Sequence, residues 1–541
     1  MGIYVNPDNL SFREAVNSLI YVDKSELINY TNSVLRTQRK NLCVSRPRRF
    51  GKSMAADMLT AYYSRGCDSR ELFSGLKAAQ GEDVLEEARS KEMARIRAYK
   101  TNLNQHNVIR FDVQRFLFDE EHVQIFIERI QDVIIRELKE EFGECFDNNY
   151  GQYRLPGVLE QIYACTGCGF IFIIDEWDCV FRVAKEDKEI QKKYLDFLRG
   201  LFKGAEYVEL AYMTGILPIK KYGEHSALNI FDEYSVTDPK NLGRYFGFTE
   251  EEVREQCTRY GMDFAEMEKW YDGYRLGDFH IYNPKSAVDA LTWKKVKSYW
   301  TGTETYEAMK IYIEMNFDGL REAVVEMLGG GQCRIDPTTF QNDMTTFHMK
   351  DDVLTLLVHL GYLTYDEQTD KVSIPNQEIA QEFMRAVRAG GWGNLMEVLN
   401  RSEELLKSTW AMDADAVAEG VAEARKDTSS IIRYNDENSL ACALYAAYFS
   451  AQVYYAKPIR EMPGGRGFAD VVYLPLRNVD RPALLIELKW NKSASGALMQ
   501  MKEKKYTDWV KSYTGDILLV AINYDKAKDT HECIIEKYTK E

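Results

Sequence analysis

The amino-acid sequence predicts an α/β fold in which a parallel sheet is covered by helices on both faces. Three observations carry this prediction. Residues 41–44 read as the end of a short buried strand and lead through a tight loop into a helical run at 54–59, and the five apolar residues at 170–174 suit a strand buried on both faces. Strand-like and helical runs also alternate along residues 41–213. Parallel strands joined by crossover helices produce this alternation.

The composition limits the class of protein. The chain has 541 residues, enough for several domains, and a formal net charge of −15. A protein that coats nucleic acid through bulk positive charge is therefore excluded, and any contact with nucleic acid must be local. The ten cysteines are scattered, so we expect reduced thiols in a cytoplasmic protein. Cys165 and Cys168 form a C-x-x-C pair, which lacks the second pair of ligands that zinc needs.

No targeting or membrane segment is expected. The first residues, MGIYVNPDNL, have neither the basic nor the apolar region of a signal peptide. The longest apolar runs, such as 170–174 and 517–522, have the length of strands and fall far short of the roughly 18 residues of a membrane span. We therefore expect a soluble protein without membrane contact.

The elements of the first part follow in order. A helical run at 25–35 precedes the first strand, and residues 54–99 have a helical pattern. A second strand is predicted at 108–113, a long helix at 121–142 and a third strand at 208–213. Aromatic, turn-rich segments around 270–284 are expected to close this part of the chain.

The loop after the first strand has the composition of a phosphate-binding loop. Residues 44–53 read VSRPRRFGKS, so Gly51, Lys52 and Ser53 open the helix. A glycine lets backbone N–H groups approach an anion, a lysine reaches the β- and γ-phosphates of ATP, and a serine hydroxyl binds Mg²⁺. The alternative is a basic turn before an ordinary helix.

This loop departs from the general P-loop pattern at its first glycine. Arg46 stands at that position, and Pro47 removes one N–H group from the loop. We expect the guanidinium groups of Arg46, Arg48 and Arg49 to hold phosphate in place of the missing amide donors.

Two carboxylates end the strand at 170–174. Asp175 is predicted to hold Mg²⁺ through water, and Glu176 to orient and deprotonate the attacking water. Thr214, at the end of the next strand, is the candidate sensor of the γ-phosphate. Acids and threonines also end strands without any function, so the prediction depends on their pairing with the loop upstream.

The middle of the chain predicts a helical, winged-helix module. Residues 352–360, 362–365, 372–374 and 376–387 read as helix, strand, strand and helix. The helices carry little positive charge, so we expect packing between domains rather than DNA binding. The predicted domains are 1–295, 296–392 and 393–541.

The last part carries a second chemical signal. If the hairpin folds about residues 478 and 479, Asp470 faces Glu487, and Lys489 points to the same face because strand side chains alternate with period two. Two carboxylates and the backbone carbonyl of Leu488 would hold Mg²⁺, and the lysine would orient the attacking water. The alternative is a surface hairpin with a salt bridge.

Six segments, in order, resemble the bacterial AAA-ATPase-like proteins that carry a C-terminal PD-(D/E)XK nuclease domain. They are IYVDKSELI, SRPRRFGKS, FIIDEWD, MTGILPIK, WYDGYR and YNPKS. The resemblance covers nearly the full length and implies a restriction-endonuclease-like α/β fold for the last domain. It implies nucleotide binding by Lys52 and Ser53 and metal-linked chemistry at Asp175 and Glu176. The family also has an arginine-rich loop in place of the first glycine.

The resemblance adds three residues to the predicted nuclease site. Glu437 corresponds to an acid on an N-terminal helix, with simple helix capping as its alternative. Gln500 and Tyr506 correspond to a glutamine and a tyrosine beside the metal, although their spacing of six residues fits Tyr506 poorly.

These observations predict ATP binding or hydrolysis coupled to cleavage of nucleic acid, with DNA as the expected substrate. Both sites would use Mg²⁺, and the nuclease site could use Mn²⁺. The competing interpretation is a nucleotide-dependent switch whose C-terminal domain binds nucleic acid or a protein partner without cutting. The sequence leaves open whether copies of the chain form a homo-oligomer.

Overall fold

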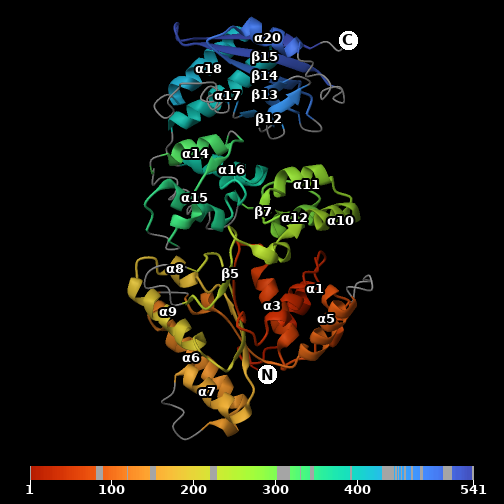
Figure 1. The fold of residues 1–541 in the computed structure, drawn as a ribbon, viewed down its shortest axis with the longest axis vertical. Helices are drawn as coiled ribbons and strands as arrows, with labels where there is room; N and C mark the ends of the chain where they lie inside the picture. The colour runs from red at the N-terminus through yellow and green to blue at the C-terminus, as the bar shows by residue number, and fades with distance from the viewer. Residues whose placement is uncertain are drawn as a thin grey trace. The chain divides into compact units, whose positions relative to one another are not determined.

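A computed structural model shows a chain of two compact units (Figure 1). The first comprises Met1–Tyr299 and Ile335–Asp370, and the second Trp300–Arg334 and Lys371–Glu541. The structure describes residues 2–80, 89–117, 120–146, 154–219, 228–300, 317, 319–328, 330–341, 346–389, 393–428, 444, 447–448, 450–451, 454–455, 459–464, 467–475, 479–503 and 515–538.

The first unit is built on a parallel sheet, which confirms the predicted fold class. Its strand order is β2 (Asn107–Asp112), β3 (Phe170–Asp175), β4 (Val208–Gly215), β1 (Asn41–Ser45) and β5 (Asp232–Tyr234). All neighbouring pairs run parallel. The carboxyl ends of β1, β3 and β4 therefore meet at one edge, where ligands bind in open α/β sheets. The edge strand β5 was not predicted from the sequence.

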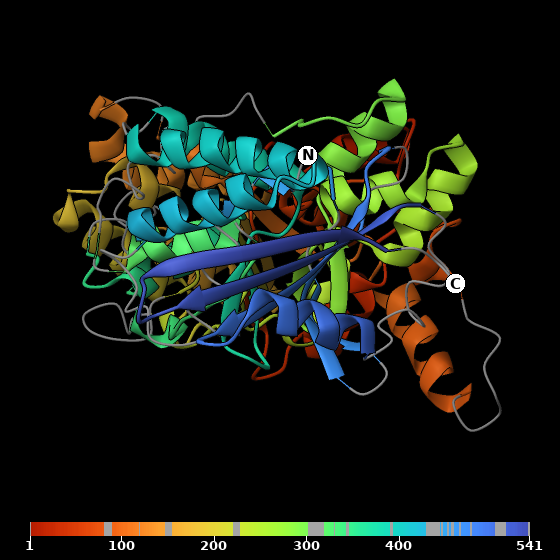
Figure 2. The ribbon, with the colours of Figure 1, turned by 90° about the horizontal axis from the view of Figure 1, so that it is seen from above.

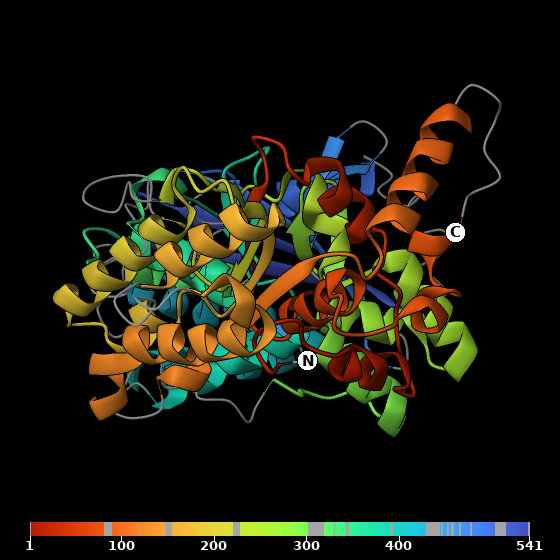
Figure 3. The same cartoon turned by 90° about the horizontal axis from the view of Figure 1, so that it is seen from below.

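Helices cover both faces of this sheet. On one face, α3 (Lys52–Tyr63) packs with Ile171, Ile173 and Tyr212 in a single hydrophobic cluster. On the other face, the ring of Phe172 meets Phe202 of α9 (Lys188–Phe202) at 5.2 Å. The helix α6 (Glu120–Glu141) lies on the same side as α9, opposite α1 (Leu10–Val16) and α3 (Figures 1 and 3). Apolar residues alternate along β3 between the two faces, which explains its unbroken apolar run.

The helical pattern at 54–99 proves to be several helices. They are α3, α4 (Arg70–Phe73) and α5 (Arg89–Asn102). The first break occurs because Ser64 turns extended, with φ −61° and ψ 123°, and its hydroxyl donates to the carbonyl of Pro7 at 2.6 Å. The helical pattern is thus divided, because a contact with the N-terminal segment ends α3 at Tyr63 despite the local propensity.

The aromatic, turn-rich segment forms a small antiparallel sheet with helices around it. The strands are β6 (Phe248–Thr249), β7 (Tyr274–Leu276) and β8 (Phe279–Tyr282), and the helices are α10 (Glu250–Tyr260), α11 (Phe264–Tyr271) and α12 (Pro284–Trp293). A capping box between Thr249 and Glu252 starts α10. The first unit also contains α2 (Leu27–Val34), α7 (Leu155–Thr166), α8 (Cys179–Val183), α15 (Lys350–Leu360) and β10 (Thr364–Asp366).

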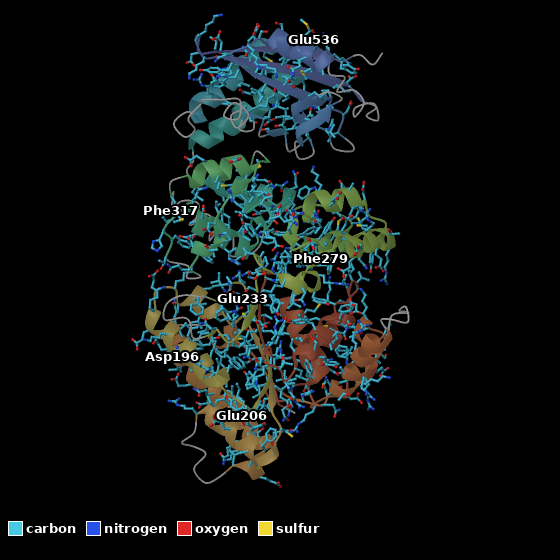
Figure 4. All side chains as sticks on the ribbon, in the orientation of Figure 1. Asp196, Glu206, Glu233, Phe279, Phe317 and Glu536 are labelled. Atoms are coloured by element: carbon cyan, nitrogen blue, oxygen red, sulfur yellow. A yellow bond between two sulfur atoms is a disulfide. The ribbon has the colours of Figure 1, made fainter. Side chains whose placement is uncertain are left out.

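The second unit contains a mixed sheet in the order β12 (Ile459–Gly464), β13 (Gly467–Tyr473), β14 (Ala483–Trp490), β15 (Ile517–Asp525) and β16 (Thr530–Lys537). Strands β14 and β15 are parallel and the other pairs antiparallel. The helices α17 (Gly393–Trp410) and α18 (Ala414–Thr428) cover one face, and α20 (Ala494–Glu503) covers the other (Figure 2). On β16, Glu536, which is labelled in Figure 4, pairs with Lys502 of α20 at 2.5 Å.

The middle of the chain has the predicted order of helix, strand, strand and helix. The elements are α15, β10, β11 (Lys371–Ser373) and α16 (Gln377–Ala389). The strand β11 pairs with β9 (Cys333–Arg334), which follows α14 (Leu320–Leu328). The strands β9, β12 and β16 were not predicted from the sequence.

The cysteines correct one prediction. A disulfide joins Cys145 and Cys165, so the expectation of reduced thiols is wrong for this pair. The two Cα atoms lie 5.9 Å apart, which is within the usual range for a disulfide. Cys165 is thus bonded to Cys145, whereas Cys168 is exposed and has a free thiol. Within the described ranges, no helix combines the length and apolar character needed to cross a membrane.

Candidate active sites

The loop between β1 and α3 leaves a helix N-terminus free to bind an anion. Gly51 has φ 88°, in the left-handed region, and a Cβ built on it would meet no atom within 4 Å. No side chain caps α3, so its first-turn N–H groups remain available as donors. Arg49 also adopts a left-handed conformation, with φ 71°. The strand, loop and helix predicted around this site are all present.

Lys52 lies beneath this loop and is only 4% exposed. Its Nζ atom donates to the carbonyl of Pro47 at 3.2 Å and lies 3.7 Å from Oε1 of Glu176. The two predicted residues from β1–α3 and β3 therefore meet in the structure. The next residue, Ser53, is exposed.

The three loop arginines have different surroundings. Arg46 is fully buried, and its Nη1 donates to the carbonyls of Ser45 and Tyr234 at 2.7 Å each. Burial lowers the pKa of this guanidinium to about 9. Arg49 donates to the carbonyl of Tyr299 at 3.1 Å. Arg46 thus joins β1 to β5 through Nη1, while its buried Nε and Nη2 have no hydrogen-bond partner among the described residues.

At the end of β3, Asp175 is buried beside Thr214, and Glu176 is partly buried. The hydroxyl of Thr214 donates to Oδ1 of Asp175, which also accepts the backbone N–H of Glu176 at 3.0 Å. Glu176 has φ 52°, a conformation that costs a non-glycine residue on the order of 1 kcal/mol or more. The adjacent N–H of Trp177 donates to the carbonyl of Thr214 at 3.0 Å, so neighbouring contacts hold the turn in place.

Two residues of this site were missed from the sequence. Arg182, on α8, pairs with Glu176 and lies 3.2 Å from Oδ2 of Asp178. Burial alone would raise the pKa of Glu176, but the charges of Lys52, Arg182 and Arg48 outweigh it and lower that pKa. The spacing of four residues between Asp178 and Arg182 could have indicated this ion pair from the sequence, because it places both side chains on one helical face.

Two further acids lie near this edge of the sheet. Asp112 is in register with Asp175 on the neighbouring strand, and Asp57 of α3 pairs with Arg110 of β2. Burial raises the pKa of each of these carboxyls to about 6. No motif in the sequence singled out either residue.

The donors at this edge fit a nucleotide with Mg²⁺. An uncapped helix N-terminus, a buried lysine and a buried carboxylate supply the N–H, ammonium and oxygen groups that a metal-bound phosphate takes.

Glu487 and Lys489 form the core of the second site. Both lie on β14, and Nζ of Lys489 donates to Oε1 of Glu487 at 2.8 Å, although Glu487 is only 1% exposed. The register between β13 and β14 pairs Val471 with Ile486, as the predicted turn requires. Continuing it by one residue sets Asp470 opposite Glu487. The side chain of Asp470 is outside the described residues.

The β14 face that carries Glu487 and Lys489 is the one that α20 covers. Leu485, two residues before Glu487, packs with Ala497 and Leu498 of α20. Gln500 also lies on α20 and is partly buried. The predicted nuclease residues on β14 and α20 therefore share one side of the sheet.

The connection from β14 to α20 is held by two side chains that the sequence did not single out. Asn523, in register with Lys489, accepts the backbone N–H of Lys492 at 3.0 Å and donates to the carbonyl of Lys492 at 3.2 Å. Glu532 accepts the N–H of Ala494 at 3.2 Å, at the start of α20. These contacts fix the chain that follows Lys489.

The donors on β14 are of the oxygen type that Mg²⁺ prefers. They are the carboxylate of Glu487 and the backbone carbonyl of Leu488, with Asp470 opposite by register. In the part of the chain that the structure describes, no three His, Cys, Asp or Glu side chains cluster closely enough to hold a metal by themselves. Glu437 and Tyr506 lie outside the described residues.

Comparisons with known proteins also find two different domains in the two parts of the chain that carry these sites. Residues 11–223 match a family model described as a predicted AAA-ATPase, and residues 435–533 match that of the PD-(D/E)XK nuclease superfamily.

Similar proteins were found among curated sequences and solved structures. An uncharacterized protein in the vnfD 5′ region of Azotobacter chroococcum mcd 1 is 26% identical over 295 residues, which are 53% of this chain and 51% of that protein. The chain thus spans about half the length of this curated relative. A Walker-type ATPase of Pyrococcus abyssi is 12% identical, with a TM-score of 0.34, over 67% of this chain and 94% of its own. With its two family matches, the chain carries an AAA-ATPase-like domain and a C-terminal domain of the PD-(D/E)XK nuclease superfamily.

Proposed function

We propose that this protein binds and hydrolyses ATP at the Lys52 site and that this controls metal-dependent cleavage of nucleic acid, expected to be DNA, at the Glu487 site. One observation supports the proposal: a lysine lies close to a glutamate in each of the two domains, with Lys52 3.7 Å from Glu176 and Lys489 2.8 Å from Glu487. We further propose a division into an ATPase domain at 1–295, a linker domain at 296–392 and a nuclease domain at 393–541.

In the ATPase domain, Lys52 and the first turn of α3 bind the phosphates, aided by Arg48. Ser53 and Asp175 would hold Mg²⁺, which neutralises phosphate charge when bound. Thr214 orients Asp175 through its hydroxyl, and Glu176 takes the proton of the attacking water on a carboxylate oxygen. Glu176 stays ionised for this role because Lys52 and Arg182 flank it.

In the nuclease domain, Asp470, Glu487 and the carbonyl of Leu488 would hold a divalent metal, which activates water and stabilises charge on the phosphodiester when bound. Lys489 orients the attacking water beside Glu487. Gln500 on α20 contacts the substrate or the water from the same side of the sheet.

The test measures cleavage of single- and double-stranded DNA and RNA with Mg²⁺ or Mn²⁺, with and without ATP. The variants are Lys52→Ala and Glu487→Ala, and the matched controls are Lys203→Ala and Glu419→Ala, both at exposed residues. We expect Glu487→Ala to abolish cleavage and Lys52→Ala to abolish the effect of ATP, while both controls behave as wild type.

The outcomes separate the two halves of the proposal. Cleavage by Glu487→Ala at the wild-type rate would refute the nuclease assignment. ATP binding without cleavage of any substrate would instead favour the nucleotide-dependent switch. Unchanged ATP affinity in Lys52→Ala would refute the nucleotide site.

A further inference from the structure

We propose that Arg182 is a positioning residue that holds Glu176 in its working orientation during ATP hydrolysis. This inference rests on the proposed ATPase function and adds a residue to it. Arg182 does not touch the nucleotide in this scheme, since it acts through the carboxylate of Glu176.

The contacts of Arg182 suit this role. Its Nη2 binds Oε2 of Glu176 and its Nε lies 3.2 Å from Oδ2 of Asp178, and the side chain is only 10% exposed. One guanidinium therefore joins two carboxylates, a geometry that a lysine ammonium does not reproduce.

Asp178 holds the guanidinium of Arg182 at a fixed position. It is fully buried and accepts the backbone N–H groups of Ile216 at 3.2 Å and Leu217 at 2.9 Å. These residues directly follow β4, so Asp178 ties the turn after β3 to the end of the neighbouring strand. Through Asp178, Arg182 is thereby connected to the end of β4.

Lys52 and Arg182 hold different oxygens of Glu176. Lys52 lies 3.7 Å from Oε1, whereas Arg182 binds Oε2. When phosphate binds, the ammonium of Lys52 serves the phosphate. Arg182 then remains on Oε2, and Oε1 is left to accept the proton of the attacking water.

The backbone of Glu176 needs such support. Its φ of 52° is unfavourable for a side chain of this size, and such conformations persist only where the surroundings fix them. Its N–H donates to Asp175 and its carbonyl accepts the N–H of Cys179 at 2.9 Å. The backbone is thus fixed by hydrogen bonds, and Arg182 fixes the carboxylate.

The experiment compares the full-length wild type with Arg182→Met, Arg182→Lys and the control Arg199→Met. Arg199 forms an exposed i,i+3 pair with Asp196 on α9. The assays measure the Kd of a fluorescent ATP analogue, kcat and KM for ATP, and thermal unfolding without nucleotide or metal. Unfolding is also measured for Glu176→Gln and for the double variant Arg182→Met/Glu176→Gln.

We expect Arg182→Met to lower kcat by about tenfold to a hundredfold, because misplacing a reacting group costs rate rather than affinity, while Kd and KM change less than about twofold. Arg182→Lys should recover part of kcat with wild-type Kd, and Arg199→Met should match wild type in every assay. In thermal unfolding, the effects of Arg182→Met and Glu176→Gln should be non-additive, because the residues are in contact.

Four results would overturn the inference. Unchanged kcat in Arg182→Met would remove the positioning role while leaving ATP hydrolysis intact in the wild type. Additive effects in the unfolding cycle would show that the contact contributes nothing in the nucleotide-free protein. A wild type that binds ATP but hydrolyses none would reject both the positioning role and the hydrolytic half of the proposed function. If Arg182→Met does not fold, a wild-type kcat in Arg182→Lys would reject the inference equally, because it would show that hydrolysis does not need a guanidinium that binds both carboxylates.

Discussion

Individual buried charges decide much of the chemistry of this protein. Glu176 stays ionised in a buried turn because cations flank it, whereas Asp178 is buried and its pKa is raised despite the neighbouring Arg182. A buried charge is costly without partners, so each contact in this cluster affects both stability and function.

His359 makes the stability of the first unit sensitive to acid. It is 1% exposed on α15, and burial, with the charge of Arg46, lowers its pKa to about 3. The unfolded chain binds a proton near the ordinary pKa of a histidine, about 6.5, but the folded protein does not. The contribution of neutral His359 to the free energy of unfolding is therefore fully present above about pH 6.5. It is lost as the pH falls from about 6.5 towards 3.

We predict that His359 alone costs the wild type about 2 kcal/mol between pH 7 and pH 5. Urea unfolding at both pH values should show this loss in wild type and in the exposed control His348→Gln, but not in His359→Gln. Equal acid sensitivity in all three proteins would contradict the prediction.

At the scale of elements, the end of β4 has no room for a side chain at Gly215. A Cβ there would lie 2.6 Å from Oδ1 of Asp178 and 2.7 Å from the indole of Trp177. Gly200 is the matched contrast, since it lies within α9 and a Cβ there would meet nothing within 4 Å.

We therefore predict opposite effects of two identical substitutions. Gly215→Ala should lower the free energy of unfolding by about 2 kcal/mol through overpacking. Gly200→Ala should raise it by about 0.5–1 kcal/mol, because alanine favours a helix over glycine. Chemical denaturation measures both, and a neutral Gly215→Ala would show that the turn after β3 can shift.

The Cys145–Cys165 disulfide joins the residues that follow α6 to α7. The two residues are 20 positions apart, and closing a loop of this length stabilises a protein by about 3 kcal/mol in the chain-entropy description. Cys145→Ala should lower stability by this amount, and a reductant should do the same to wild type. Cys168→Ala is the control, since this thiol is exposed and free. Stability that is indifferent to both Cys145→Ala and reductant would argue against the bridge.

At the scale of the whole molecule, the two compact units predict two cooperative unfolding transitions. A ligand that binds only the folded form raises the transition of the unit that holds it. Mg²⁺ with ATP should therefore raise one transition, and Lys52→Ala should abolish that shift. Calorimetry of the full chain measures both, and a single transition that shifts as a whole would show that the units unfold together.

Much of this architecture was predictable from the sequence. Apolar runs and period-two alternation located β1, β3, β4, β14 and β15, and residue types after the strands identified the Lys52 and Asp175–Glu176 motifs. The turn predicted at 478–479 requires the register that pairs Val471 with Ile486, and with it the expected facing of Asp470 and Glu487. These features are local, because strand periodicity and turn position are fixed by neighbouring residues.

Other features were decided only by tertiary structure. Arg182 meets Glu176, Cys145 meets Cys165, and Asp112 stands beside Asp175 because particular strands and helices become neighbours. Arg46 is predicted to hold phosphate, and the fold adds a contact that the sequence did not show, because its guanidinium also joins β1 to the unpredicted edge strand β5. The sequence by itself thus determined which segments carry the chemistry, since periodicity and residue type are written along the chain. The structure decided the partners of each charge, because partners depend on which distant segments pack together.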